Sequence, residues 1–343
     1  MVKRLRIGIV GAGFGAIGHL PALRNHPRFE VVAIASPSSA AGIAREAGLP
    51  YAFSSCEEML AGCSVNVVTI ASPPFAHAGN VIAALAAGKH VLCEKPFALG
   101  TADAQAMLEA ATSAGTACGV AHEFRFLPQI QALKELAAHG HLGELRNLEI
   151  TLLRSSLRRD ERRPRSWWFE AQRGGGLAGA VLSHMIDQAS WLTDYAPATT
   201  LGLRRTANAQ REDDQGRFES TVDDGAFALL DYGNGFVARL TADGTTAVES
   251  YTCALHGEKR TAVASGPWMT DLALYTVDSD ETNELTCKPS RYSEYESLGP
   301  NVPPLMELYD ELLEKIEGKP NALPSFEEAL VTQKALAAIG YGT

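Results

Sequence analysis

The chain has 343 residues, of which 46% are hydrophobic and 20% are charged, and its formal net charge at pH 7 is -10. This length suits two domains, and the composition is that of a globular protein with sizeable cores and not of a disordered chain. The acidic balance, without a basic stripe, argues against nucleic acid or an anionic membrane as the main partner, so we expect a small-molecule partner.

The first predicted strand, Leu5 to Val10, runs directly into a glycine-rich turn and then into a helical pattern. The basic residues before it precede an apolar run that is too short for a signal peptide. No run in the chain approaches the roughly 20 apolar residues that a membrane-spanning helix needs. We therefore expect a cytoplasmic protein that does not bind a membrane.

The order of strand, glycine turn and helix is typical of the first βαβ unit of a dinucleotide-binding fold. In such a turn Gly11 permits the bend, Gly13 lets the backbone approach a pyrophosphate, and Ala16 stands where a third glycine often packs. The alternative is that these glycines only shape the turn. Cofactor contacts are expected from Gly11, Gly13, Phe14, Gly15 and Ala16.

The second predicted strand, Glu30 to Ser36, ends where such a fold places the adenosine ribose. An acidic residue there would select NAD, but the sequence has Ser36 at this end. The missing acid removes a repulsion against a 2′-phosphate, and no arginine follows before Arg45. We expect NAD or NADP as the cofactor, with a slight preference for NADP.

A third strand, Val65 to Ala71, is followed by Ser72 and by two prolines that begin at Pro73. Two prolines make a rigid turn, which suits a loop that lies against the nicotinamide half of a cofactor. His77 then opens a helix that continues to Ala87. We include Ser72, Pro73 and His77 among the cofactor contacts, although a histidine in a first helical turn is more often a packed or capping residue.

The next strand, Val91 to Cys93, ends in Glu94, Lys95 and Pro96. Ligands bind outside the carboxyl ends of the strands in an open parallel sheet, so a charged pair at this end has reason to face a bound molecule. Proline also pushes the residue before it away from helical conformation. We expect Glu94 beside the cofactor and Lys95 between cofactor and substrate.

A helix from Ala102 to Ala114 and a strand around Ala117 to Ala121 continue the alternation. Arg125 follows that strand, ahead of a helix that runs to about His139. It is expected to contact cofactor or substrate, and the alternative is a surface ion pair. The six cysteines show no metal-binding spacing, so we expect free thiols and no metal site.

From Leu145 the pattern changes to strands in succession, with a hairpin turn at Gly233 to Gly235 and helices again from Pro303. This predicts an antiparallel sheet whose open face carries a substrate pocket or a dimer interface. The expected strands are Leu148 to Leu153, Asp224 to Tyr232, Phe236 to Thr241 and Tyr251 to His256.

Two stretches of this half stand out. Arg154 to Arg165 is rich in arginine and precedes Trp167, and it either binds an anionic substrate or forms a self-paired surface loop. Further along, three glycines from Gly174 give a flexible entry to a helix in which His184 and Asp187 share one face. This spacing lets the carboxylate orient the imidazole, or the pair is structural.

Taken together, these motifs resemble the Gfo/Idh/MocA family of nicotinamide-dependent oxidoreductases over nearly the full length. The matching segments are GAGFGAIGHLPAL from Gly11, SPPFAHAGNVIAALAAGKHVLCEKPFAL from Ser72, FRFLP from Phe124, GHLGEL from Gly140 and GGGLAGAVLSHMID from Gly174. The resemblance implies an N-terminal Rossmann domain, a C-terminal α+β domain on a large, mostly antiparallel open sheet, and a homodimer or homotetramer. It also implies that Lys95 and His184 line the substrate pocket beside the nicotinamide.

One departure concerns Ala180, since many dehydrogenases of the family have an aspartate four residues before the histidine. This makes inositol oxidation less expected, and Leu182, in place of a glycine, is expected to narrow the pocket. We expect residues 1–122 to bind the dinucleotide and residues 123–343 to bind substrate and to form the oligomer, with C-terminal helices packing back on the first domain. The expected function is hydride transfer to or from a sugar-like or cyclic alcohol, with Lys95 and His184 as catalytic residues and Arg125, Trp167 and Asp187 as further substrate contacts. The alternative is a regulator on the same fold that senses a sugar or dinucleotide without turnover.

Overall fold

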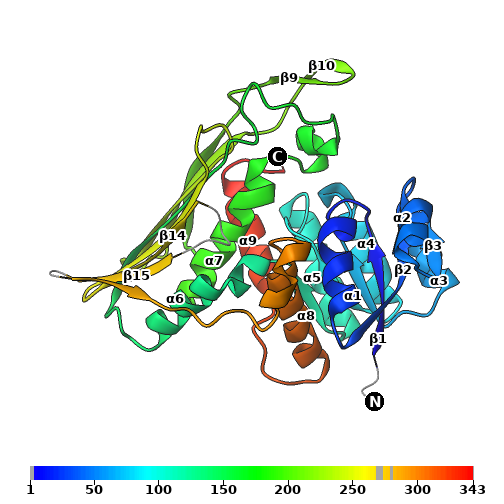
Figure 1. The fold of residues 1–343 in the computed structure, drawn as a ribbon, viewed down its shortest axis with the longest axis horizontal. Coiled ribbons are helices and arrows are strands. Elements are labelled where there is room, and N and C mark those ends of the chain that lie inside the picture. The colour runs from blue at the N-terminus through cyan, green and yellow to red at the C-terminus, as the bar shows by residue number, and fades with distance from the viewer. Residues whose placement is uncertain (1–3, 268–272, 279–280, 343) are drawn as a thin grey trace. The chain divides into compact units, whose positions relative to one another are not determined.

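The structure is a computed structural model that describes residues 4–267, 273–278 and 281–342 (Figure 1). Its contacts divide the chain into two compact units. The first unit combines the chain up to Glu123 with Ser290–Leu330, so a late segment completes it. The second unit combines Phe124–Pro289 with the segment that begins at Val331.

The first unit is built on a sheet of six parallel strands in the order β3-β2-β1-β4-β5-β6. Every residue of β4 is buried, as are the last three of β5, and this explains why both read as short, nearly unbroken apolar runs. The strand order is that of the Rossmann fold, which confirms the predicted parallel sheet. The strands are β1 (Leu5–Val10), β2 (Phe29–Ala35), β3 (Tyr51–Phe53), β4 (Val67–Ile70), β5 (His90–Cys93) and β6 (Cys118–Val120).

Helices connect these strands and bury apolar side chains against the sheet. Val81 of α4, Met59 of α3 and Met107 of α5 are fully buried in this core. The short strand β3 and helix α3 were not predicted, since Tyr51 and Ala52 are exposed and leave no buried pattern to read. The helices are α1 (Leu20–Asn25), α2 (Ala40–Ala47), α3 (Cys56–Gly62), α4 (His77–Ala86) and α5 (Thr101–Ala114), and a π-helical turn, η1 (Gly15–His19), precedes α1.

The late segment of the first unit carries α8 (Val302–Ile316), which begins with two prolines in its first turn. Proline suits this position because the first amides of a helix have no intrahelical acceptor. The helix packs against α1 and η1, and its Tyr309 is fully buried. Residues more than 280 positions apart in the sequence therefore share one core.

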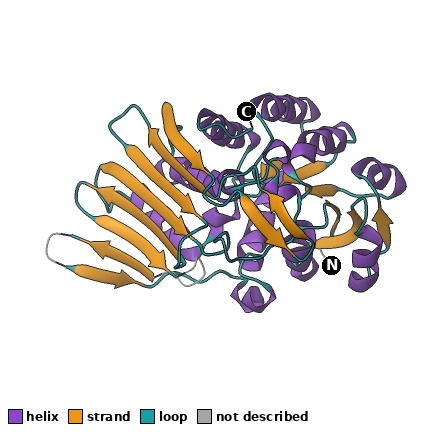
Figure 2. Ribbon diagram, turned by 90° about the horizontal axis from the view of Figure 1, so that it is seen from above, coloured by secondary structure: helices purple, strands orange, loops and turns teal. Residues whose placement is uncertain are grey.

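The second unit is built on an eight-stranded sheet in the order β16-β15-β14-β13-β7-β12-β11-β8, whose strands lie side by side in Figure 2. Only β7 and β12 pair in parallel, and the other neighbours are antiparallel, which confirms a large, mostly antiparallel sheet. The expected turn at Gly233 to Gly235 joins the antiparallel strands β11 and β12. The strands are β7 (Leu145–Leu153), β8 (Thr199–Arg205), β11 (Gly225–Asp231), β12 (Val237–Asp243), β13 (Ser250–Gly257), β14 (Thr261–Gly266), β15 (Ala273–Val277) and β16 (Thr282–Leu285), with β9 (Gln210–Asp213) and β10 (Gly216–Glu219) as a separate hairpin.

Two helices cover this sheet: α6 (Pro128–Ala138) packs on β14, and α7 (Ser183–Thr193) packs on β7 and β12. A π-helical turn, η6 (Ala178–Leu182), leads into α7, so the helix expected after the three glycines begins with a wider turn. The last helix, α9 (Phe326–Ala338), contributes Phe326 to the core of the first unit and Leu336 to the core of the second.

Candidate active site

The glycine turn after β1 is shaped by close packing on one side and open space on the other. Gly11 has φ +113°, and a Cβ there would lie 2.1 Å from the carbonyl oxygen of Ala71, so only glycine fits. A Cβ on Gly13 would meet nothing within 4 Å. The turn therefore leaves room over Gly13, which fits the approach of a pyrophosphate to the backbone.

The carboxyl ends of four parallel strands bring most of the predicted cofactor residues of the first unit to one edge. The amide of Gly11 donates to Ala35 O at 2.8 Å, and the amide of Glu94 donates to Ile70 O at 2.8 Å. Ser36 follows Ala35, and Ser72 lies two residues beyond Ile70. The glycine turn, Ser36, Ser72 and the Glu94–Lys95 pair thus share the edge where ligands of such sheets bind.

His77 is buried and braces two of the loops at this edge. One ring nitrogen, Nε2, lies 2.7 Å from Ser72 O, and the other, Nδ1, lies 3.1 Å from Pro96 O and 3.2 Å from Phe97 O. Burial lowers the pKa of His77, although these carbonyl oxygens oppose the effect. Its ring therefore ties the loop after β4 to the loop after β5.

Glu94 is buried, and each of its carboxylate oxygens has a partner. Oε1 lies 2.8 Å from His19 Nε2, and Oε2 accepts the amide of Lys95 at 3.1 Å. Burial alone would raise the pKa of Glu94, but the hydrogen bond from His19 and the positive charges of His19 and Lys95 lower it overall. Lys95 itself is half-buried and joins Pro96 through a cis peptide bond.

His19 and Tyr309 were missed in the sequence analysis. His19 Nδ1 lies 2.8 Å from the hydroxyl of Tyr309, and that hydroxyl lies 2.8 Å from Thr69 Oγ1. The position of His19, close behind the glycine turn, is the signal that could have singled it out. Tyr309 gives no such signal, because it belongs to a helix 290 residues further along the chain.

In the second unit, Arg125 and Asp187 form a buried ion pair. Arg125 Nε donates to Asp187 Oδ2 at 2.7 Å, and Nη2 donates to Oδ1 at 2.6 Å. Both side chains are at most 2% exposed, so the expected alternative of a surface ion pair is wrong. The Asp187 carboxylate is thus bonded to an arginine, whereas His184, one turn earlier on α7, makes a different contact.

His184 is buried and lies face to face with Phe124, with ring centroids 3.7 Å apart and planes 7° apart. Gln188, one turn further along α7, donates to the carbonyl of Phe124 at 3.4 Å. The segment that carries Phe124 and Arg125 is therefore held by three residues of α7. The predicted residues Arg125, His184 and Asp187 lie together in the second unit.

The glycines before α7 are not a flexible entry. A Cβ on Gly175 would lie 2.0 Å from the carbonyl oxygen of Trp168, so the backbone passes too close for any side chain. Leu182 is fully buried in the core of the second unit, where its side chain packs among apolar neighbours. Ala180 is half-buried within η6, and Trp167 is half-buried in a short 3-10 turn.

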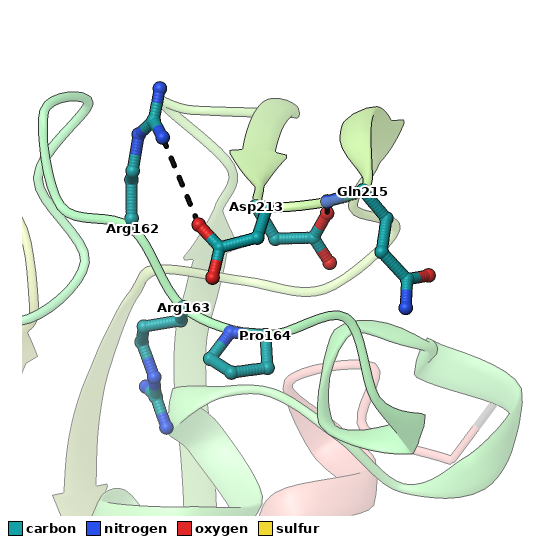
Figure 3. Close-up of a pocket in the computed structure, with 6 residues that line it drawn as sticks. Arg162, Arg163, Pro164, Asp213 and Gln215 are labelled. Atoms are coloured by element: carbon teal, nitrogen blue, oxygen red, sulfur yellow. Dashed lines mark hydrogen bonds and ion pairs between the residues drawn. The ribbon is translucent and has the colours of Figure 1, made fainter.

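The arginine-rich loop pairs with its surroundings. Arg162 Nη2 donates to Glu212 Oε1 at 2.6 Å, and the amide of Arg165 donates to Asp213 Oδ2 at 2.9 Å. Loop and hairpin enclose a pocket of about 190 Å³, in which Arg162 and Arg163 point in opposite directions (Figure 3). The guanidinium of Arg163 lies 4.7 Å from the ring centroid of Trp168. These contacts favour the self-paired surface loop over an anion site.

Membrane-spanning helices and metal-binding clusters can be assessed for residues 4–267, 273–278 and 281–342. Within these ranges no helix is long and apolar enough to cross a membrane. Within them, too, no three His, Cys, Asp or Glu side chains gather in a way that could hold a metal ion.

Comparisons with known proteins agree on one family. A family model described as "Oxidoreductase family, NAD-binding Rossmann fold" matches residues 5–122, and one described as "GFO/IDH/MocA C-terminal domain" matches residues 130–263. An uncharacterized oxidoreductase of Synechocystis sp. is 30% identical over 96% of this chain and 91% of its own length. The trans-1,2-dihydrobenzene-1,2-diol dehydrogenase of Sus scrofa is 32% identical over 77% of this chain and 75% of its own.

The fold is also found among solved structures. That of a levoglucosan dehydrogenase in complex with NADH matches with a TM-score of 0.86 and 25% identity, over 99% of this chain and 97% of that one. Together the two family models match well over half of the chain. The first covers the strands of the parallel sheet, and the second covers most strands of the eight-stranded sheet. The chain belongs to the Gfo/Idh/MocA family of NAD(P)-dependent oxidoreductases.

Proposed function

We propose that this protein oxidises a sugar-like or cyclic alcohol, or reduces the corresponding carbonyl compound, with Lys95 and His184 at the substrate. The observation that carries the proposal is one edge of the Rossmann sheet, where the open glycine turn follows β1 and the Glu94–Lys95 pair follows β5, with β4 between the two strands. The names of two relatives, a levoglucosan dehydrogenase and a dihydrobenzenediol dehydrogenase, support this substrate class.

The dinucleotide would be held by the residues at that edge. When bound, its nicotinamide ring gives or takes the hydride at C4. Gly11 and Gly13 would admit the pyrophosphate, and Phe14, Gly15 and Ala16 continue that turn. On the adenosine side Ser36 carries no charge to repel a 2′-phosphate, which favours NADPH, whereas the NADH complex of the relative favours NADH. The proposed cofactor contacts also include Ser72 and Pro73 in the loop after β4 and Glu94 in the loop after β5. His77 ties these two loops together.

Lys95 and His184 would divide the work at the substrate oxygen. The Lys95 ammonium donates a hydrogen bond to that oxygen and stabilises the negative charge that develops on it. His184 accepts the hydroxyl proton in the oxidation and returns it in the reduction. The flat contact with Phe124 fixes the plane of the imidazole. Arg125, Trp167 and Asp187 are proposed to line the substrate side.

The division of labour along the chain is part of the proposal: residues 1–122 bind the dinucleotide, and residues 123–343 bind substrate and form the oligomer. Leu201 and Leu203 of β8 are 61% and 56% exposed, and Leu229 of the neighbouring strand β11 is 40% exposed. Such an apolar strip on the edge strand and its neighbour in the eight-stranded sheet suits contact with a second copy, as a homodimer or homotetramer. A monomer in light scattering would contradict this part.

A second candidate is a regulator that binds a dinucleotide or sugar without turnover, and Ala180, in place of the aspartate found in many relatives, keeps it open. The first experiment titrates the protein with NADH and with NADPH, following tryptophan fluorescence. The second screens the tighter form, and its oxidised partner, against sugars, anhydrosugars and alicyclic diols. Binding with turnover supports the enzyme, and binding without turnover across the panel supports the regulator. Absence of binding to either nucleotide would refute both.

A further inference from the structure

A chain of buried polar side chains runs through the first unit from α8 to the strand end that carries Lys95. Thr69 Oγ1 lies 2.8 Å from the hydroxyl of Tyr309, that hydroxyl lies 2.8 Å from His19 Nδ1, and His19 Nε2 lies 2.8 Å from Glu94 Oε1. All four residues are buried.

The last step of the chain acts on the backbone of Lys95. Glu94 accepts from His19 through one oxygen and from the Lys95 amide through the other, so the two bonds together fix the plane of the carboxylate. Since a buried carboxylate is costly unless it is paired and hydrogen-bonded, the bond from His19 keeps Glu94 able to accept the Lys95 amide. The charged or titratable groups acting on Glu94 are His19, Lys95 and His77.

We propose that His19 is a positioning residue for Lys95, acting through Glu94. This inference rests on the proposed function, because that function places Lys95 at the substrate oxygen. His19 ends the π-helical turn that begins at Gly15, so it also belongs to the segment proposed to bind the pyrophosphate. One imidazole thereby joins the segment that receives the cofactor to the residue that faces the substrate.

A second buried histidine provides a matched control within the same unit. His26 Nε2 lies 3.1 Å from Asp310 Oδ1, and Asp310 is the neighbour of Tyr309 on α8. His26 is as buried as His19, and it also bonds α8 and a carboxylate. The described contacts of His26 do not include Glu94. Loss of its Asp310 bond therefore measures the cost of losing a buried histidine contact to α8, apart from any effect on Lys95.

The test uses two replacements that each keep one half of the His19 contacts. In His19→Gln the amide nitrogen stands near the place of Nε2 and can still donate to Glu94. In His19→Asn the amide reaches only the place of Nδ1 and can still bond Tyr309. His26→Asn, which loses the bond to Asp310, is the control. The measurement is hydrogen exchange at the Lys95 amide, compared with the amides of Val91 to Cys93, in the ligand-free protein.

For His19→Asn we expect the Lys95 amide to exchange at least tenfold faster while the β5 amides change less than threefold. For His19→Gln and His26→Asn we expect the exchange rates of the Lys95 amide and of the β5 amides to change less than threefold. An unchanged Lys95 amide in His19→Asn would overturn the proposal. So would a parallel rise at Lys95 and β5, or equal effects of the two His19 variants, since these outcomes indicate a merely structural histidine.

A kinetic measurement then links the geometry to the reaction. His19→Asn is expected to lower kcat up to about a hundredfold, because small misplacements of a catalytic group have effects of that size. In this variant kcat should fall by a larger factor than the affinity for the preferred nucleotide, and His19→Gln should retain most of the activity. An exchange effect without a kcat effect would overturn the link to catalysis. Failure of the wild-type protein to bind NADH or NADPH would refute the proposed function instead, so the two failures are distinguishable.

Discussion

His184 and Phe124 lie with their rings parallel, 3.7 Å between centroids, and the carbonyl of the same phenylalanine accepts from Gln188 one turn further along α7. A stacked ring restricts the imidazole to one plane, while its hydrogen-bonding nitrogens stay at the ring edge. The contact thus orients the imidazole proposed as proton acceptor without using its ring nitrogens as hydrogen-bond partners.

Replacing Phe124 by leucine should therefore release the imidazole. We expect about a tenfold loss of kcat and a loss of about 1 to 2 kcal/mol in the free energy of unfolding, since a buried aromatic ring is replaced by a smaller side chain. Steady-state kinetics and urea unfolding measure the two effects. Phe126→Leu, at a neighbouring buried phenylalanine, is the control for stability, and an equal kcat loss there would contradict the role of the stack.

Lys95→Met should remove most of the turnover while leaving the nucleotide bound. Loss of one group that stabilises developing negative charge typically lowers kcat by about a hundredfold to a thousandfold. NADH or NADPH titration and single-turnover hydride transfer separate binding from chemistry. Lys89→Met, in the segment just before β5, should behave as wild type. Full activity of Lys95→Met would remove this lysine from the mechanism.

Asp187→Ala should destabilise the protein strongly, because it leaves the Arg125 guanidinium buried without its two-bond partner. Breaking one side of a buried ion pair costs about 3 to 5 kcal/mol. The double variant Arg125→Met with Asp187→Leu should lose less than the sum of the single losses, as judged by urea unfolding. Additive losses would show that the two residues do not act as a pair.

The Glu94 carboxyl predicts a pH dependence of stability. Its pKa is lower in the folded protein than its usual value, since His19 and Lys95 outweigh the effect of burial. Such a group stabilises the fold above the unfolded-state pKa, and this contribution is lost as the pH falls through the folded-state pKa. The free energy by which wild type is more stable to unfolding than Glu94→Gln should therefore shrink as the pH falls from about 5 to about 3. Urea unfolding across this range measures the difference, and a difference that grows on acidification would contradict the lowered pKa of Glu94.

The double variant Arg158→Ala with Arg159→Ala should leave the KM of the true substrate unchanged, because Arg158 is paired with Asp160 on an exposed loop. Exposed ion pairs contribute at most about 1 kcal/mol, so stability should also change little. A rise in KM would restore the anion-binding interpretation of this loop, and thermal unfolding serves as the check that the variant is folded.

The sequence predicted those parts of the protein that local patterns encode. Three such parts are the glycine turn, the strand end at Glu94 and Lys95, and the pair His184 and Asp187. The residues of each part stand within a few positions in the sequence, so their spacing alone locates that part. The sequence did not predict contacts between residues that are far apart in the chain, such as the bond between Asp187 and Arg125 across 62 positions. Short strands such as β3 and the late strands β14 to β16 also left little signal, because their alternation is brief or partly exposed.

The return of Ser290–Leu330 to the first unit has a consequence for biosynthesis. Tyr309, which completes the core beside His19, is translated 290 residues after that histidine. The Rossmann sheet can form earlier, but His19 and Thr69 lack the Tyr309 hydroxyl as a partner until α8 has been synthesised. A nascent chain stalled before α8 would thus carry a nucleotide fold whose interior is still open, and a chaperone would meet it in that state.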